Sequence, residues 1–219
     1  MALIPLPNGA KVSLATLLGA AKPISAISNA SPAVATAAAH GFTDGKVILL
    51  ASGWSKIDNS VMRVDGSDTG TFEFDGLDTL NTSLYPAGAG AGSARELTTF
   101  TPLNKIPTFE TTGGDPKSQT TGYLDYEKDF EVFTGTNPER LNFTVSYQPD
   151  SPAYTALVAA SESGELQVIR LTLKDGSEIY YPGQLFFNKA PTTTKDQEMV
   201  NNVSLALQGE ITRFAKYVP

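Results

Sequence analysis

The residues that could carry chemistry in this sequence are few, and the first is its single histidine. His40 lies in "AAAHGF", between a run of alanines and a glycine, in a chain of 219 residues without cysteine. A zinc site or a Ser-His-Asp triad needs several ligands, or a base held beside a nucleophile. We therefore expect no catalysis by His40. We interpret "HGF" as a turn in which Gly41 adopts a conformation closed to other residues and His40 hydrogen-bonds locally.

Two glycine-rich segments resemble ligand-binding loops only superficially. The segment "DGSDTG" at 65–70 lacks the bidentate glutamate of a calcium loop, so we expect a hairpin turn there. The segment "GAGAG" at 88–92 lacks the Lys-Ser/Thr pair of a phosphate-binding loop. Glycine and alanine restrain the backbone little, so residues 85–94 are interpreted as a flexible linker or an exposed loop. The sequence thus predicts no catalytic residue, no metal site and no cofactor.

Acidic residues recur at every second position of "YLDYEKDFE". On an alternating strand they would all project from one face, and Leu124, Tyr126, Lys128 and Phe130 would take the other. Glycosidases hold two carboxylates in a cleft, whereas four in a row indicate a surface of negative potential. The row consists of Asp125, Glu127, Asp129 and Glu131.

Composition limits the class of protein. With 41% hydrophobic and 18% charged residues the chain can bury a core, and 19 glycines and 14 prolines without a long helical pattern favour many short strands. A net charge of −7 disfavours an ordinary nucleic-acid binder, because phosphates are contacted mainly by Lys and Arg. No segment approaches the roughly 20 apolar residues that span a bilayer, and the apolar segment 12–21 lacks the basic flank of a signal peptide. We expect neither membrane insertion nor secretion.

The elements that must position these residues are short strands and one helix. The segment "SPAYTALVAASESG" at 151–164 opens with an N-cap serine and a proline and closes with glycine, which predicts a helix. Its stripe of Tyr154, Leu157 and Val158 should pack on a sheet. The turn "KDGS" at 174–177 predicts a β-hairpin, and Phe72 and Phe74 alternate with polar residues as in a half-buried strand.

The residue composition and the length of the alternating segments change along the chain. They predict an all-β fold with one short helix, divided into domains. Residues 1–23 are interpreted as an extended N-terminal arm and the first part of the larger domain. Residues 24–94, rich in small residues, are interpreted as a small inserted β domain that ends in the Gly/Ala linker. Residues 95–219 have longer alternating segments and predict a β-sandwich or barrel that carries the helix.

A family resemblance follows from the order of these parts. The segments "TTGYLDYEKDFEVF", "LNFTVSYQPDSPAYTALVAA", "LQVIRLTLKDGSEIYYPGQL" and "VNNVSLALQGEITRF" follow one another in residues 95–219. This succession of a polar strand, a short helix, an Asp-Gly hairpin with a tyrosine pair and a closing strand resembles the tail tube proteins of long-tailed, non-contractile bacteriophages. Residues 24–94 resemble a small β module found in many phage structural proteins.

The resemblance implies a structural virion protein, the major tail tube subunit of a siphophage. Such subunits form rings, generally hexameric, that stack into a tube through which the tape measure protein and the phage DNA pass. The remaining partners would be tail terminator and tail tip proteins. The protein would reside in the phage tail after assembly in the bacterial host cytoplasm. No enzymatic activity is expected.

Within such a tube, an acidic channel would let DNA slide without binding. We expect the carboxylate row at 125–131 to face the lumen or to pair with basic residues across the subunit seam. Inter-ring contacts are expected from two polar or terminal segments, 1–8 and 109–123, with candidate residues Leu3, Ile4, Gly113, Gly114, Asp115 and Lys117.

Two other classes of protein remain as alternatives. A carbohydrate-binding or adhesin-like β-sandwich would need an exposed aromatic platform, but Trp54, Tyr180, Tyr181 and Tyr217 are scattered in the sequence. A head-to-tail connector, or another structural protein of a phage, would also assemble into rings.

Overall fold

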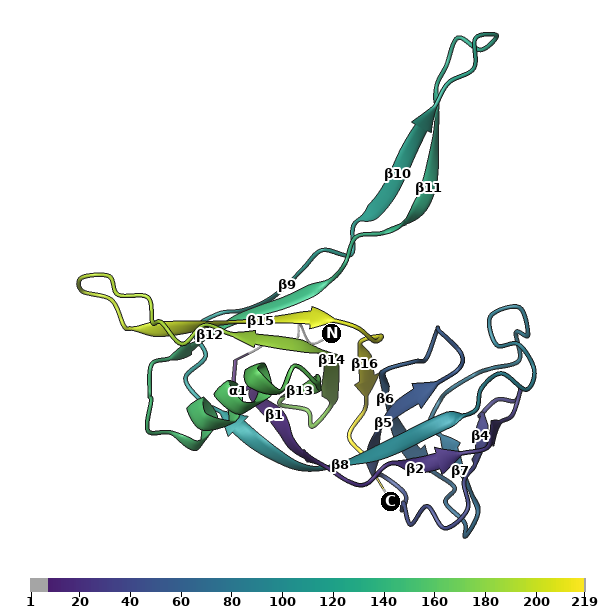
Figure 1. Ribbon diagram of the computed structural model, residues 1–219, viewed down its shortest axis with the longest axis horizontal. Coiled ribbons are helices and arrows are strands. Elements are labelled where there is room, and N and C mark those ends of the chain that lie inside the picture. Colours follow the sequence, from purple (N-terminus) through teal and green to yellow (C-terminus); the bar gives the residue numbers. More distant parts are fainter. Residues whose placement is uncertain (1–7, 219) are drawn as a thin grey trace, which may run out of the picture.

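Strands form where apolar and polar residues alternate, and they dominate the computed structural model, which describes residues 8–218 (Figure 1). Within these residues one helix, α1 (Pro152–Ser163), lies between β12 and β13. The predicted all-β class with one short helix is confirmed. The strands are β1 (Lys11–Leu18), β2 (Lys22–Ile24), β3 (Ala26–Ile27), β4 (Val34–Thr36), β5 (Val47–Ser52), β6 (Ser60–Asp65), β7 (Thr71–Phe74), β8 (Gly92–Leu103), β9 (Phe109–Thr112), β10 (Pro116–Thr121), β11 (Phe130–Thr136), β12 (Arg140–Ser146), β13 (Leu166–Thr172), β14 (Glu178–Phe187), β15 (Val200–Leu207) and β16 (Thr212–Phe214).

The larger part of the molecule is an antiparallel sheet in the order β8-β1-β13-β14-β15-β12-β9, with β16 paired to β14. We call it the main sheet. Alternate residues of its strands point to one face and form a core with α1. Deeply buried members of this core include Leu14, Leu141, Phe143, Ile169 and Leu205.

The helix forms where its local signals predict it. The Ser151 hydroxyl accepts a hydrogen bond from the Tyr154 amide at 3.1 Å, Pro152 occupies the first turn, and Gly164 ends the helix in a left-handed conformation. Leu157 is buried in the core, and Tyr154 and Val158 pack against it partly buried. The predicted helix and its apolar stripe are confirmed.

The hairpin predicted at 174–177 joins β13 to β14, which pair antiparallel from Thr172 opposite Glu178 onwards. The Asp175 carboxylate accepts hydrogen bonds from the Ser177 hydroxyl and amide at 2.6 and 2.9 Å. These bonds hold the pKa of the Asp175 carboxyl below its usual value. The turn therefore has the side-chain chemistry that its sequence indicates.

Strands β2 to β7 and the first half of β8 form a smaller β unit with a core of its own, which we call the insert. The members of this core run from Ile24 to Ala94. Phe72 and Phe74 are fully buried, as the alternation of "GTFEF" predicts. Trp54 packs edge-to-face on Tyr85 in the same core.

Of the two interpretations of residues 85–94, linker or exposed loop, the structure has a loop that is anchored on the core of the insert, with residues 86–89 and 91 exposed. The indole of Trp54 donates a hydrogen bond to the Pro86 carbonyl at 2.7 Å, and a Cβ added at Gly90 would lie 3.0 Å from the same ring. Strand β8 already begins at Gly92. The small residues here permit close packing on a tryptophan rather than flexibility.

The insert and the main sheet are joined by a shared strand and a third apolar cluster. The first half of β8 pairs with β2 and β5, and its second half pairs with β1. A cluster with members from both units fills the junction: Ala15, Leu49, Val61, Leu97, Val168, Tyr180 and Phe214. Burial and the hydrogen bond to Glu178 at 2.6 Å raise the pKa of the Tyr180 hydroxyl.

Arg63 of the insert ties the junction to the C-terminal segment. Its guanidinium pairs with Asp75, with Nε 2.7 Å from Oδ2, and donates to the Ala215 carbonyl at 2.6 Å. The same group lies 5.0 Å from the ring centroid of Phe214 and 5.5 Å from that of Tyr217. An exposed ion pair between Lys56 and Glu210 lies at the same junction.

The N-terminal region contributes a strand to the main sheet. Residues 11–18 form β1, which lies between β8 and β13 inside the main sheet. Val12 and Leu14 are buried in the core beside α1, and Ser13 and Ala15, which alternate with them, are buried as well. Leu3 and Ile4 lie outside the described residues. Within residues 8–218, no helix is long and apolar enough to cross a membrane.

Candidate functional site

His40 is part of the scaffold of the insert. Its Nδ1 accepts a hydrogen bond from the Phe42 amide at 3.1 Å, so Nε2 carries the proton and donates to the Asp68 carbonyl at 2.7 Å. The ring is buried against Phe42 and Phe72, and Gly41 has φ +70°. Residues 65–70 form the turn between β6 and β7. The predicted turns and the local hydrogen bonding of His40 are confirmed.

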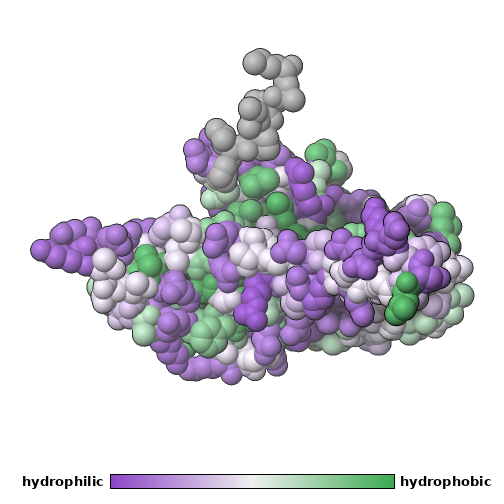
Figure 2. Space-filling view, turned by 90° about the horizontal axis from the view of Figure 1, so that it is seen from above, coloured by the Kyte–Doolittle hydropathy of each residue, from purple (hydrophilic) through white to green (hydrophobic). Residues whose placement is uncertain are grey.

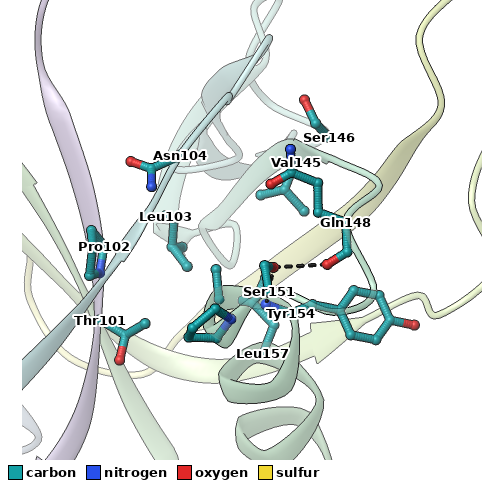
Figure 3. Close-up of a pocket in the computed structure, with 12 residues that line it drawn as sticks. Thr101, Pro102, Leu103, Asn104, Val145, Ser146, Gln148, Ser151, Tyr154 and Leu157 are labelled. Atoms are coloured by element: carbon teal, nitrogen blue, oxygen red, sulfur yellow. Dashed lines mark hydrogen bonds between the residues drawn. The ribbon is translucent and has the colours of Figure 1, made fainter.

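A small pocket at the N-terminus of α1 has no catalytic arrangement (Figure 3). Leu103, Val145 and Leu157 make much of its wall, and its lining contains no histidine, carboxylate or lysine. The Ser151 hydroxyl donates to the Gln148 carbonyl at 2.8 Å and caps the helix, so it is not paired with a base. Among the described residues no group of three metal-ligating side chains comes together.

The aromatic residues considered for a sugar platform are occupied elsewhere. Trp54, Tyr180 and Tyr181 are buried, and Tyr217 lies under the Arg63 guanidinium. The exposed aromatic residues are instead concentrated on the β10–β11 hairpin, at Tyr123, Tyr126, Phe130 and Phe133.

The β10–β11 hairpin leaves the main sheet after β9 and projects away from the body of the molecule (Figure 1). Two glycines with positive φ, Gly113 and Gly114, make the bend at its root, and a Cβ at Gly113 would clash with the Pro138 carbonyl. The Asn137 amide closes the root by donating to the Asp115 carbonyl at 2.8 Å. The candidates Gly113, Gly114 and Asp115 thus lie at the root, and Lys117 lies in β10.

The expected strand through the carboxylate row is wrong. Residues 122–129 form the turn region between β10 and β11, with the Tyr126 amide donating to the Tyr123 carbonyl at 3.1 Å. Asp125, Glu127 and Asp129 therefore surround the tip and share no strand face. Only Glu131 lies on β11, where it accepts a hydrogen bond from Ser118.

The tip combines these carboxylates with exposed apolar side chains. The ring of Tyr126 lies 6.2 Å from that of Tyr123 and 5.4 Å from that of Phe130, and Leu124 is fully exposed. Nearly every residue of β10 and β11 is exposed as well. The alternation of charge and aromatic residues fitted a strand with one buried face, but this hairpin has no layer behind it. Alternation alone does not distinguish the two cases.

A second surface, which sequence reasoning missed, is the face of the main sheet opposite α1. On β9, β12 and β15 it carries hydroxyl and amide side chains joined by hydrogen bonds: Ser204 to Asn142 at 2.9 Å, Asn142 to Thr112 at 3.0 Å, and Thr108 to Thr144 at 2.8 Å. We call it the Asn/Thr face. Its charged members on these strands, Glu110 and Arg140, have opposite signs. In the sequence of β12, polar residues alternate with Leu141, Phe143 and Val145. This period-two alternation was the signal that could have indicated a polar face.

The β14–β15 connection is a third projecting feature. Residues 188–199 extend to the left in Figure 1, and Figure 2 shows that the corresponding projection is covered with hydrophilic side chains. Asn201 anchors its base by donating to the carbonyls of Asn188 and Lys189 at 2.9 and 3.3 Å.

Two solved structures are similar to part of the chain, each at 10% identity. They are the tail of an empty GTA particle with C6 symmetry and the six-fold symmetrised baseplate of the anti-feeding prophage AFP. The first match covers 54% of this chain and 88% of the other, with a TM-score of 0.42; the second covers 55% and 87%, with a TM-score of 0.38. A search of curated proteins gave no match.

The family assignment comes from the sequence match. Residues 52–216 match the family described as phage tail tube protein, TTP, so the match runs from the insert through the hairpin and α1 to β16. It covers most of the chain and includes the Asn/Thr face and the exposed hairpin. The chain therefore belongs to the phage tail tube protein family and is a structural subunit of a phage tail tube.

Proposed function

We propose that this chain is the major tail tube subunit, which forms stacked rings around a channel for phage DNA. The observation that carries the proposal is the β10–β11 hairpin, a two-stranded ribbon exposed along both strands. An isolated ribbon of this kind is marginally stable in water, and its aromatic tip forms an exposed apolar patch. Contact with other subunits would bury this patch and stabilise the ribbon. Six subunits per ring is the number that the sequence resemblance predicts.

We infer that the Asn/Thr face lines the channel. Its side chains are hydroxyls and amides that are already hydrogen-bonded to one another, and the one arginine on β12 is balanced by Glu110 on β9. A wall with a row of Lys or Arg would hold phosphates with a salt-dependent attraction, whereas a neutral wall in a chain of net charge −7 leaves DNA hydrated and mobile.

The carboxylates at the tip fit the subunit seam better than the lumen. Asp125, Glu127 and Asp129 surround Tyr126 and Leu124, and an exposed apolar cluster is stabilised by burial against protein rather than by a water-filled channel. Of the two expectations for the acidic row, the seam is therefore the one proposed for these three residues.

The remaining partners follow from a tube that contains DNA. The tape measure protein and DNA would pass through the channel, and terminator and tip proteins would bind the two ends of the tube. Assembly would take place in the host cytoplasm before the protein becomes part of the virion tail. The proposed role is structural and requires no catalytic step.

Electron microscopy of the purified protein tests the assembly, with rings or long tubes as the expected result. The channel assignment is tested by Thr144→Lys with Asn202→Lys, which adds two positive charges per subunit to the Asn/Thr face. Tubes should form, and DNA ejection should slow most at low salt. Thr193→Lys with Thr194→Lys, which adds the same two charges in the hydrophilic β14–β15 loop, is the matched control. Normal ejection at every salt concentration by the double variant would contradict the channel assignment.

A further inference from the structure

We propose that the tip of the β10–β11 hairpin docks in a groove of a second copy of this chain, beside β1 and the β8–β9 connection. The groove is lined by residues 8–12 and 102–107 with Phe109 and Leu171, and we call it the lysine groove. This inference rests on the proposed function, and it names the surface that receives the hairpin.

The tip presents an apolar centre with acidic residues around it. Tyr123, Leu124 and Tyr126 are each more than half exposed, and the aromatic rings contact one another rather than the body of the subunit. Asp125, Glu127 and Asp129 alternate with these residues, and Lys128 is the one basic side chain between them. A matching surface must therefore be apolar at its centre and basic at its rim.

The lysine groove has that character. Its volume is about 780 Å³, and Val12 and Leu103 form a buried floor beside the half-buried Phe109. Lys11 and Lys105 line it with exposed side chains, and no carboxylate does. Opposite charges at the edge of an apolar contact select the partner and its register.

The groove is also fixed in shape. Lys105 has φ +54°, a left-handed conformation that is unusual for a lysine. Its carbonyl accepts hydrogen bonds from both the amide and the hydroxyl of Ser146, each at 3.1 Å. The β8–β9 connection is thus held in one conformation by β12, and a preformed receptor loses little entropy on binding.

The geometry favours a second copy over the same subunit. The groove lies at the start of β9, and the hairpin begins after the other end of that strand. The hairpin then extends away from the body (Figure 1), and six residues of β10 span about 20 Å. The tip is therefore carried away from its own groove and toward a neighbour.

Complementary charge reversal tests the docking. One variant carries Asp125→Lys, Glu127→Lys and Asp129→Lys, and the other carries Lys11→Glu and Lys105→Glu. All five side chains are exposed, so folding should be retained, which circular dichroism can check. Each variant alone should yield about tenfold less sedimenting tube than the wild type, or lower still. An equal mixture should assemble, because each tip then meets a groove of opposite charge.

Disulfide trapping tests the contact itself, since the chain has no cysteine. Leu124→Cys and Ile106→Cys, prepared as separate proteins and mixed under oxidising conditions, should form a covalent heterodimer. Leu124→Cys mixed with Thr193→Cys is the control and should not. Tubes in which the first pair of variants forms no covalent heterodimer, or a charge-reversed mixture that stays unassembled, would overturn the docking and leave the tube function standing. Wild-type protein that never leaves the monomeric state would overturn both.

Discussion

The insert and the β10–β11 hairpin are both rich in aromatic residues, but only the insert buries them within its own fold. Trp54, Phe72 and Phe74 are at most 1% exposed, whereas Tyr126 is 59% and Phe133 is 70% exposed. The insert has strands and a packed loop on both sides of its aromatic core, and the hairpin is a single ribbon. Aromatic content therefore does not decide burial; a second layer of structure does. Where the chain supplies no such layer, another subunit is the natural source.

The largest expected change in stability comes from truncating a side chain in the core of the insert. We expect Trp54→Ala to lower the free energy of unfolding by about 3–5 kcal/mol, because it leaves a large cavity and removes the hydrogen bond from the indole to the Pro86 carbonyl. Chemical denaturation of the monomer measures this. Trp54→Phe, which keeps most of the apolar volume, should cost clearly less. Equal losses for both substitutions would argue against the cavity as the cause.

The link between the insert and the main sheet ranks next. We expect Arg63→Ala to cost about 2 kcal/mol, since it leaves the half-buried Asp75 and the Ala215 carbonyl without their charged donor. Lys56→Ala removes the exposed pair with Glu210 at the same junction and should cost about 0–1 kcal/mol. Thermal unfolding of the two variants side by side is the measurement. A reversed order would mean that Arg63 does not hold the junction.

At the root of the hairpin the expected effect on stability is smaller. Gly113→Ala places a Cβ against the Pro138 carbonyl in a backbone with φ +89°, which we expect to cost about 1 kcal/mol or more and to change the direction of the hairpin. Gly70→Ala, where the added Cβ meets nothing within 4 Å, is the matched control. Tube yield should fall for the first variant and not for the second. Normal tubes from Gly113→Ala would show that the hairpin's direction is not critical.

The smallest expected change in stability accompanies a large change in assembly. Tyr126→Ser with Phe130→Ser should alter the free energy of unfolding of the monomer by about 0.5 kcal/mol or less, because both rings are exposed. Tubes should nevertheless be lost. Sedimentation and electron microscopy measure the assembly. A large loss of monomer stability would mean that the rings at the tip stabilise their own subunit, as those of the insert do, and would contradict the prediction.

The parts of the fold that the sequence predicted are those whose signals are local. The helix at 152–163 has its cap, its proline and its closing glycine within one segment, and the turns at 65–70 and 174–177 are recognisable from Gly and Asp alone. His40 is correctly assigned to the scaffold because the chain has no second histidine and no cysteine that could bind a metal together with it.

The parts that sequence reasoning missed depend on what lies across space. The composition of residues 85–94 does not reveal that Gly90 and the Pro86 carbonyl contact Trp54, which is distant in the sequence. The carboxylate row fits a single strand because its alternation is the same whether the chain continues or reverses at 122–129. The Asn/Thr face escapes notice because its uncharged residues acquire a pattern only when β9, β12 and β15 lie side by side.

Strand β8 has a mechanical consequence. Its twelve residues run without interruption from the insert into the main sheet. There they pair with β1, in the same sheet that carries the Asn/Thr face. Sliding the insert relative to the main sheet would require several backbone hydrogen bonds between paired strands to break at the same time. A force parallel to the strands is therefore shared by all of these hydrogen bonds. A bending or twisting load on the insert would thus be transmitted along this continuous strand into the main sheet.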